Sequence, residues 1–187
     1  EIPMPRVQSG TRPYLAPEDG GGLSVADGKP SLQGTESVCA ALTLPKNQPM
    51  PEAGWPIALY GHGTGGSFRS AIRDAAEPLS AITVDGQTYG VATLGWDGPM
   101  HGRRQRDAAG PALDPGALFY NLGNPVAARG NLYQGAADVF ALVRLVKGWS
   151  FVVPGVNGGA PIHFDPAKIL LVGHTSKEGV EKANVKL

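Results

Sequence analysis

The chain has 187 residues, of which 42% are hydrophobic and 17% charged, and its 16 basic residues balance its 16 acidic residues. This length and composition suit one globular domain with a buried core. Zero net charge gives no reason to expect nucleic acid as a partner, and no apolar stretch is long enough to predict a membrane span. The chain begins at Glu1 without a visible signal peptide, which leaves open both an exported protein whose signal was removed and a cytoplasmic one.

Residues 1–36 are rich in proline, glycine and polar residues, and they are predicted to form an extended arm with one short edge strand. The folded core is expected over 37–187, beginning with a strand at 37–44. The apolar run 56–61 ends at a glycine, which predicts a strand buried on both faces. Apolar residues at helical spacing predict a helix over 67–80.

A second buried strand is predicted at 89–95, and a long loop follows it as far as Asn124. The clearest helix covers 125–147, because Pro125 suits its first turn and Gly148 suits its end. Its predicted buried face is apolar and comprises Val126, Leu132, Ala136, Val139, Phe140, Val143 and Val146. Its polar side, expected to face solvent, comprises Asn131, Tyr133, Gln134 and Asp138.

A third buried strand is predicted at 168–173. Strands that alternate with helices imply parallel strands joined by right-handed crossovers. The predicted fold class is therefore α/β, with a mostly parallel sheet and flanking helices. In such sheets ligands bind where the carboxyl ends of the strands meet the following loops. Those loops begin at Gly61, Gly95 and Gly173.

The first of these loops, 61–66, reads Gly-His-Gly-Thr-Gly-Gly. Glycines between a strand and a helix leave backbone N–H groups bare, and such a loop can hold a phosphate or the oxyanion of an acyl-transfer intermediate. Gly63, Thr64 and Gly65 are the predicted oxyanion-hole residues. The alternative is a tight turn whose glycines only permit positive φ.

The second loop carries Asp97 and His101. Asp97 either fixes the turn by accepting backbone N–H groups or orients an imidazole, and His101 is either a packing residue or a site residue. The cations that follow, Arg103, Arg104 and Arg106, are predicted to be solvated.

The third loop places Thr175 and Ser176 after a strand, where a nucleophile elbow would sit. The elbow pattern Gly-x-Ser-x-Gly is broken, since Thr175 holds the central position and Lys177 that of the second glycine. Thr175 and Ser176 are the candidate nucleophiles, with His101 or His62 as their base. The four histidines lack metal-ligand spacing, so neither a metal nor a cofactor is predicted.

Three motifs in this order resemble those of α/β-hydrolase esterases and lipases. Residues 57–66 look like the family's strand and oxyanion loop, 97–103 resemble its Asp-x-x-x-His-Gly loop, and 169–174 resemble its nucleophile strand. The resemblance implies a truncated three-layer sandwich, incomplete at the C-terminus, that hydrolyses short acyl esters. The chain departs from the family at the elbow, and no His follows Ser176.

Three functions stay open. The first is a serine-type carboxylesterase with a non-standard or incomplete triad. The second is an inactive or partner-completed half-domain, which would form a homo-oligomer or bind a second chain through an open sheet edge. The third is a binding module that holds a phosphate or carboxylate at the glycine-rich loop.

Overall fold

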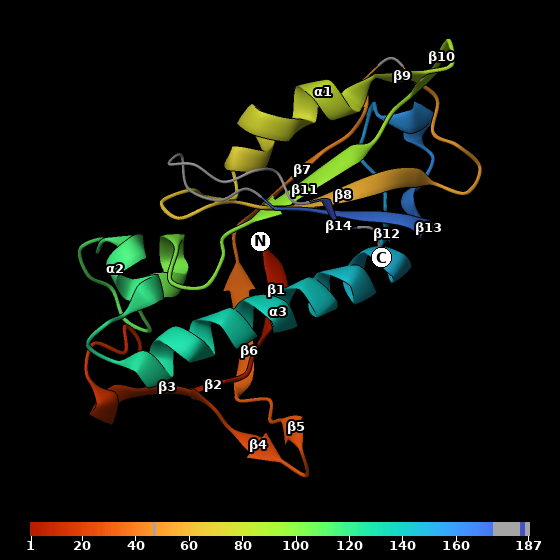
Figure 1. Cartoon of the computed structure of the whole chain (residues 1–187). Helices are drawn as coiled ribbons and strands as arrows, with labels where there is room; N and C mark the ends of the chain where they lie inside the picture. The colour runs from red at the N-terminus through yellow and green to blue at the C-terminus, as the bar shows by residue number, and fades with distance from the viewer. Residues whose placement is uncertain (47, 174–183, 186–187) are drawn as a thin grey trace.

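The computed structural model describes residues 1–46, 48–173 and 184–185, and it contains a mixed sheet with helices on both faces (Figure 1). Six strands form this sheet in the order β12-β13-β8-β11-β7, with β14 also paired to β13. Their bounds are Ala40–Thr43 (β7), Trp55–Gly61 (β8), Ala92–Trp96 (β11), Ser150–Phe151 (β12), Ile162–Gly173 (β13) and Asn184–Val185 (β14).

The three predicted inner strands lie side by side. β8 pairs in parallel with β11 on one side and with β13 on the other, so the chain leaves all three at the same rim of the sheet. The remaining pairings, of β7 with β11 and of β12 and β14 with β13, are antiparallel. The prediction of a mostly parallel sheet is therefore wrong. Parallel pairing needs a long crossover, and β12 reaches β13 without a crossover helix.

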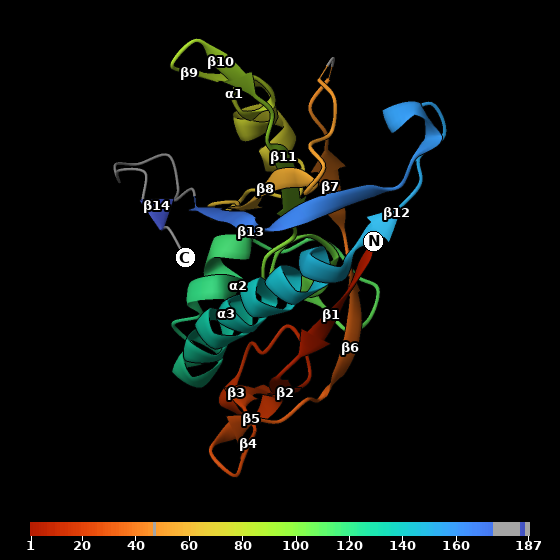
Figure 2. The ribbon, with the colours of Figure 1, turned by 90° about the vertical axis from the view of Figure 1, so that its right-hand side faces the viewer.

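Helices cover both faces of the sheet, as the turned view shows (Figure 2). On one face the predicted 67–80 helix is realised as a π-helical segment, Ile72–Ala76, followed by α1, Glu77–Ser80. On the other face lies the long helix α3, Pro125–Gly148, with the short helix α2, Pro115–Tyr120, near its first turns. None of the described helices is long and apolar enough to cross a membrane.

The N-terminal region is more structured than an extended arm. Antiparallel pairs join β1 to β6, β2 to β3 and β4 to β5, and the region contains the buried side chains of Met4 in β1 and of Tyr14 between β2 and β3. The bounds are Ile2–Arg6 (β1), Gln8–Gly10 (β2), Gly20–Leu23 (β3), Val25–Ala26 (β4), Lys29–Pro30 (β5) and Gly34–Val38 (β6). The predicted 37–44 strand is split between β6 and β7.

Three 3-10 turns and one hairpin complete the described elements. The turns are Pro17–Asp19, Gly102–Gln105 and Asn157–Gly159, and the hairpin joins Ile82–Val84 (β9) to Gln87–Tyr89 (β10).

The helix α3 has almost the predicted bounds but a different buried face. As far as Asp138, its fully buried side chains are Ala127 and the polar Asn131, Gln134 and Asp138, whereas Val126, Leu132 and Phe140 are exposed. The first half contacts the N-terminal strands: the Gln134 amide donates to the Pro5 carbonyl and accepts the N–H of Val7. Unpaired backbone groups buried there would be costly, so polar side chains face inward.

Candidate functional site

The loops that follow β8 and β11 contact each other and carry the two histidines predicted for the site. The ring centroids of His62 and His101 are 4.7 Å apart, in an edge-to-face arrangement. Parallel pairing of β8 with β11 explains this proximity, because it brings both loops to one rim.

Each imidazole accepts a backbone hydrogen bond from the loop that carries the other. The N–H of Gly98 donates to Nε2 of His62 over 3.0 Å, and the N–H of Gly65 donates to Nε2 of His101 over 3.1 Å. Each Nδ1 lies 2.8 Å from a carbonyl oxygen, that of Gly63 for His62 and that of Pro99 for His101. A nitrogen that accepts an N–H carries no proton, so both rings are neutral Nδ1–H tautomers.

The surroundings favour this neutral state. Burial lowers the pKa of His62 below its ordinary value. Burial also lowers the pKa of His101, and the neighbouring His62 ring lowers it further. Both imidazoles are therefore unprotonated at pH 7, and the two reciprocal hydrogen bonds are kept.

Asp97 fixes the position of the second loop. Its carboxylate accepts the N–H of Phe68 over 2.8 Å, and its own N–H donates to the carbonyl of Cys39 over 3.0 Å. Among the described residues, no hydrogen bond joins this carboxylate to either imidazole. Asp97 thus accepts a backbone N–H, but from the segment after the first loop and not from its own turn.

A cavity of about 290 Å³ lies beside the two imidazoles. Its lining comprises Gly61, His62, Gly63, Thr64, Trp96, Gly98, Pro99, His101, Phe119, Tyr120 and Gly135. The aromatic walls come from β11 and from the end of α2, and the hydroxyl of Tyr120 lies 3.3 Å from that of Thr64. Within the described ranges the lining contains no Asp, Glu, Lys or Arg, which suits an uncharged group.

The predicted oxyanion-hole residues differ in what their N–H groups do. The N–H of Gly65 is engaged by His101. Gly63 and Thr64 line the cavity, and no hydrogen bond within the described part of the chain uses their N–H groups. Two of the three predicted donors are therefore available to a ligand.

The candidate nucleophiles Thr175 and Ser176 lie outside the described residues. What is described is the strand that precedes them: β13 ends at Gly173, whose register partner in β8 is Gly61. β13 therefore ends beside the end of β8, where the first loop begins.

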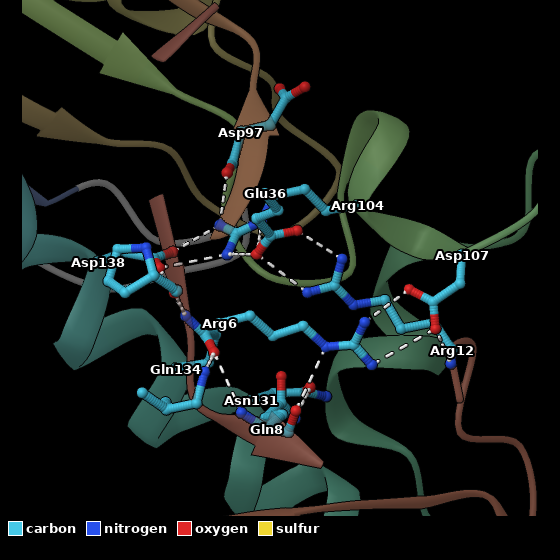
Figure 3. Close-up of polar contacts among 12 residues, drawn as sticks. Arg6, Gln8, Arg12, Glu36, Asp97, Arg104, Asp107, Asn131, Gln134 and Asp138 are labelled. Atoms are coloured by element: carbon cyan, nitrogen blue, oxygen red, sulfur yellow. Dashed lines mark hydrogen bonds and ion pairs between the residues drawn. The ribbon is translucent and has the colours of Figure 1, made fainter. Parts of the chain in front are cut away.

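Under the second loop lies a cluster of buried ion pairs, hereafter the ion-pair cluster, formed by Arg12, Glu36, Arg104 and Asp138 (Figure 3). Arg104 was expected in solvent, yet its side chain is only 2% exposed and donates to the fully buried Asp138 and to the carbonyl of Asp97. Burial alone would raise the pKa of Glu36, but Arg12 and Arg104 outweigh it and lower that pKa to about 2.

The ion-pair cluster fixes the position of the second loop, which carries His101. Because Arg104 joins Asp97 to Asp138 of α3, it fixes the segment that carries His101 against the helix. The prediction of a solvated Arg104 fails because a charge with several partners of opposite charge can be buried.

The lining residues that were not predicted from the sequence include Phe119, Tyr120 and Gly135. A signal for α2 was present in the sequence. Asp114 followed by Pro115 is typical of a helix start, and the Asp114 carboxylate accepts the N–H of Ala117. For Gly135 the signal is a glycine in a helix interior. Glycine weakens a helix, so its presence there indicates that the missing side chain leaves space that is used.

Comparison of the chain with known protein families, curated proteins and solved structures gives no match. A functional hypothesis for this chain therefore depends on the cavity and on the loops that form it.

Proposed function

We propose that the protein is a carboxylic ester hydrolase of the α/β-hydrolase type, with Ser176 or Thr175 as the nucleophile. The observation that carries this proposal is that the loops after the parallel strands β8 and β11 line one cavity with two imidazoles and unengaged backbone N–H groups. Gly173 pairs with Gly61, and Ser176 follows by three residues, a span of at most ~10 Å. That length of chain is enough to bring the nucleophile to the rim where the cavity lies.

The donors for the oxyanion would be the N–H groups of Gly63 and Thr64, which face no partner among the described residues. The base would be His101. Its Nε2 must exchange the N–H of Gly65 for the hydroxyl of the nucleophile, and the released N–H would then join the oxyanion loop. A neutral imidazole with a lowered pKa is available as a base at pH 7.

The expected enzyme is slow. In a Ser-His-Asp triad a buried carboxylate holds the Nδ1–H of the base, whereas here the carbonyl of Pro99 does so. A carbonyl stabilises the imidazolium less than a carboxylate does. Activated esters with short acyl chains are therefore the substrates to test first.

The test is hydrolysis of p-nitrophenyl butyrate by the wild type and by Ser176→Ala, Thr175→Val and His101→Phe. We expect loss of the nucleophile to lower kcat/KM by at least about a hundredfold. Ser150→Ala, an exposed serine of β12, is the matched control and should keep the wild-type rate. A fluorophosphonate should label the nucleophile, and mass spectrometry would identify the residue.

If both hydroxyl variants retain the wild-type rate, and neither residue is labelled, the proposed nucleophiles are wrong. If the wild type itself does not exceed the buffer rate, the esterase proposal fails altogether.

A second candidate function is a half-domain completed by a partner, which would be a second copy or another chain. The observation in its favour is the edge of β13. β12 pairs with Ile162 and His163, and β14 pairs with Leu171 and Val172. Between these pairings, residues 164–170 have no strand partner on that side within the described ranges. An unpaired edge is a template for another strand.

The mass of the protein in solution distinguishes this candidate from an independent enzyme. Light scattering after gel filtration should give a dimer or a larger assembly. A monomer with a single cooperative melt would contradict it.

A further inference from the structure

The walls of the cavity are mainly rings. Trp96 comes from the end of β11, and Phe119 and Tyr120 come from the end of α2. Phe119 contacts the His101 ring at a centroid distance of 6.3 Å and the Tyr120 ring at 5.4 Å, both at steep interplanar angles. Aromatic rings prefer edge-to-face and offset partners of their own kind. A planar ring entering the cavity would meet several such partners.

The size of the cavity suits one ring. A closed apolar cavity of roughly 150 Å³ holds benzene, whereas pockets for drug-sized molecules begin at about 300 Å³. The present cavity, of about 290 Å³, lies between the two. It therefore fits a single ring with a short substituent.

Two glycines of α3, Gly130 and Gly135, differ in whether packing explains the glycine. A Cβ at Gly130 would lie 1.9 Å from the carbonyl oxygen of Gly21, so packing against β3 requires a glycine there. A Cβ at Gly135 would meet only the Pro99 ring, at 3.9 Å, which is an ordinary contact. Packing does not require a glycine at 135, although glycine weakens a helix interior. The space at Gly135 belongs to the cavity.

We propose that this cavity binds an uncharged single-ring aromatic group of the substrate, with Gly135 as the residue that sets its size. The assignment of that group to an ester rests on the proposed function; binding of the ring does not. Benzyl and phenyl esters are the substrate class that follows. The imidazoles add no charge, because both are neutral and both Nε2 atoms are engaged.

The experiment is an NMR titration of the full chain with benzyl alcohol, and with cyclohexylmethanol as a non-aromatic probe of similar size. Benzyl alcohol should shift the amides of Gly98 and Gly135 and the indole of Trp96, and it should bind at least about threefold more tightly than cyclohexylmethanol. Gly135→Leu should weaken binding about tenfold or more, since its side chain fills the cavity.

Two variants keep the test independent of folding. Gly135→Ala should raise the melting temperature, because alanine stabilises a helix. It should still weaken the binding of benzyl alcohol, because its methyl group enters the cavity. Ala136→Leu, an exposed position one residue away, should leave binding unchanged.

The proposal is overturned if benzyl alcohol leaves the cavity amides unshifted, if Gly135→Ala and Gly135→Leu bind it like the wild type, or if cyclohexylmethanol binds equally well. Ring binding without hydrolysis of benzyl or phenyl esters would count against the esterase alone.

Discussion

The ion-pair cluster and the imidazole pair, His62 and His101, are two sets of polar side chains removed from solvent. They differ in how their hydrogen-bonding groups are satisfied. The ion-pair cluster sets the two arginines, Arg12 and Arg104, against the carboxyl groups of Glu36 and Asp138. The imidazole pair, His62 and His101, stays neutral and satisfies each ring with backbone groups. The two are directly connected in sequence, since Arg104 follows His101 by three residues.

This difference indicates that the ion-pair cluster supports the fold, whereas the imidazole pair can interact with a ligand. The ion pairs lie under the second loop and hold it against α3. The imidazole pair borders a cavity, and each Nε2 can exchange its backbone donor for another one. Charge is therefore used where the fold must be fixed, and neutrality where a ligand can enter.

The largest effect is expected from Arg104→Met. It leaves the fully buried Asp138 and the adjacent Glu36 without their shared cation, and a buried pair broken on one side loses about 3–5 kcal/mol. The free energy of unfolding in urea measures this loss. Arg103→Met, at an exposed position, should change it by less than about 0.5 kcal/mol. Equal effects of the two variants would mean that the ion-pair cluster does not support the fold.

A somewhat smaller loss of the free energy of unfolding is expected when the pH is lowered. The pKa of Glu36 lies at about 2, below its ordinary value of 4.5. A lowered carboxylate pKa stabilises the fold above pH 4.5, and this contribution is lost as the pH falls from 4.5 to about 2. The wild type should lose about 3 kcal/mol in this window. Glu36→Gln should be less stable at pH 6 and should depend less on pH below 4.5, unlike the exposed control Glu18→Gln.

The inner strands β8 and β11 could be predicted from the sequence because their signal is local, whereas 168–173 of β13 were predicted as buried and are exposed or half-buried. β8 and β11 consist almost wholly of apolar residues and end where a glycine-rich loop begins. The direction of the outer strands could not, since it depends on which distant segment reaches the sheet edge. Thr43 of β7, for example, pairs with Thr93 far along the chain.

The histidines and the first two loops of the site were also predictable, because a strand followed by glycines fixes where a loop lies in an α/β sheet. The engagement of each Nε2 was not, since it depends on a backbone N–H of the opposite loop. Gln134 and Asp138 were misassigned for a related reason. Helical periodicity treats polar residues as solvated, whereas these two serve the N-terminal strands and Arg104.

The smallest effect concerns the imidazole pair, and it sharpens the comparison because it falls in another pH window. A histidine with a lowered pKa stabilises the fold above its ordinary value of 6.5, and this contribution is lost as the pH falls through the lowered value. Protonation at Nε2 would set an N–H against the N–H of Gly98 or Gly65. The wild type should therefore begin to lose stability below pH 6.5, before Glu36 titrates.

His62→Gln with His101→Gln tests this directly, because glutamine offers a neutral acceptor that does not titrate in this range. At pH 7 the double variant should lose only about 1–2 kcal/mol, since its acceptors are imperfectly placed. Between pH 6.5 and 5 its unfolding free energy should stay flat while that of the wild type falls. His163→Gln, outside the pair, should follow the wild type. Parallel curves for the double variant and the wild type would show that neutral imidazoles are not what holds the two loops together.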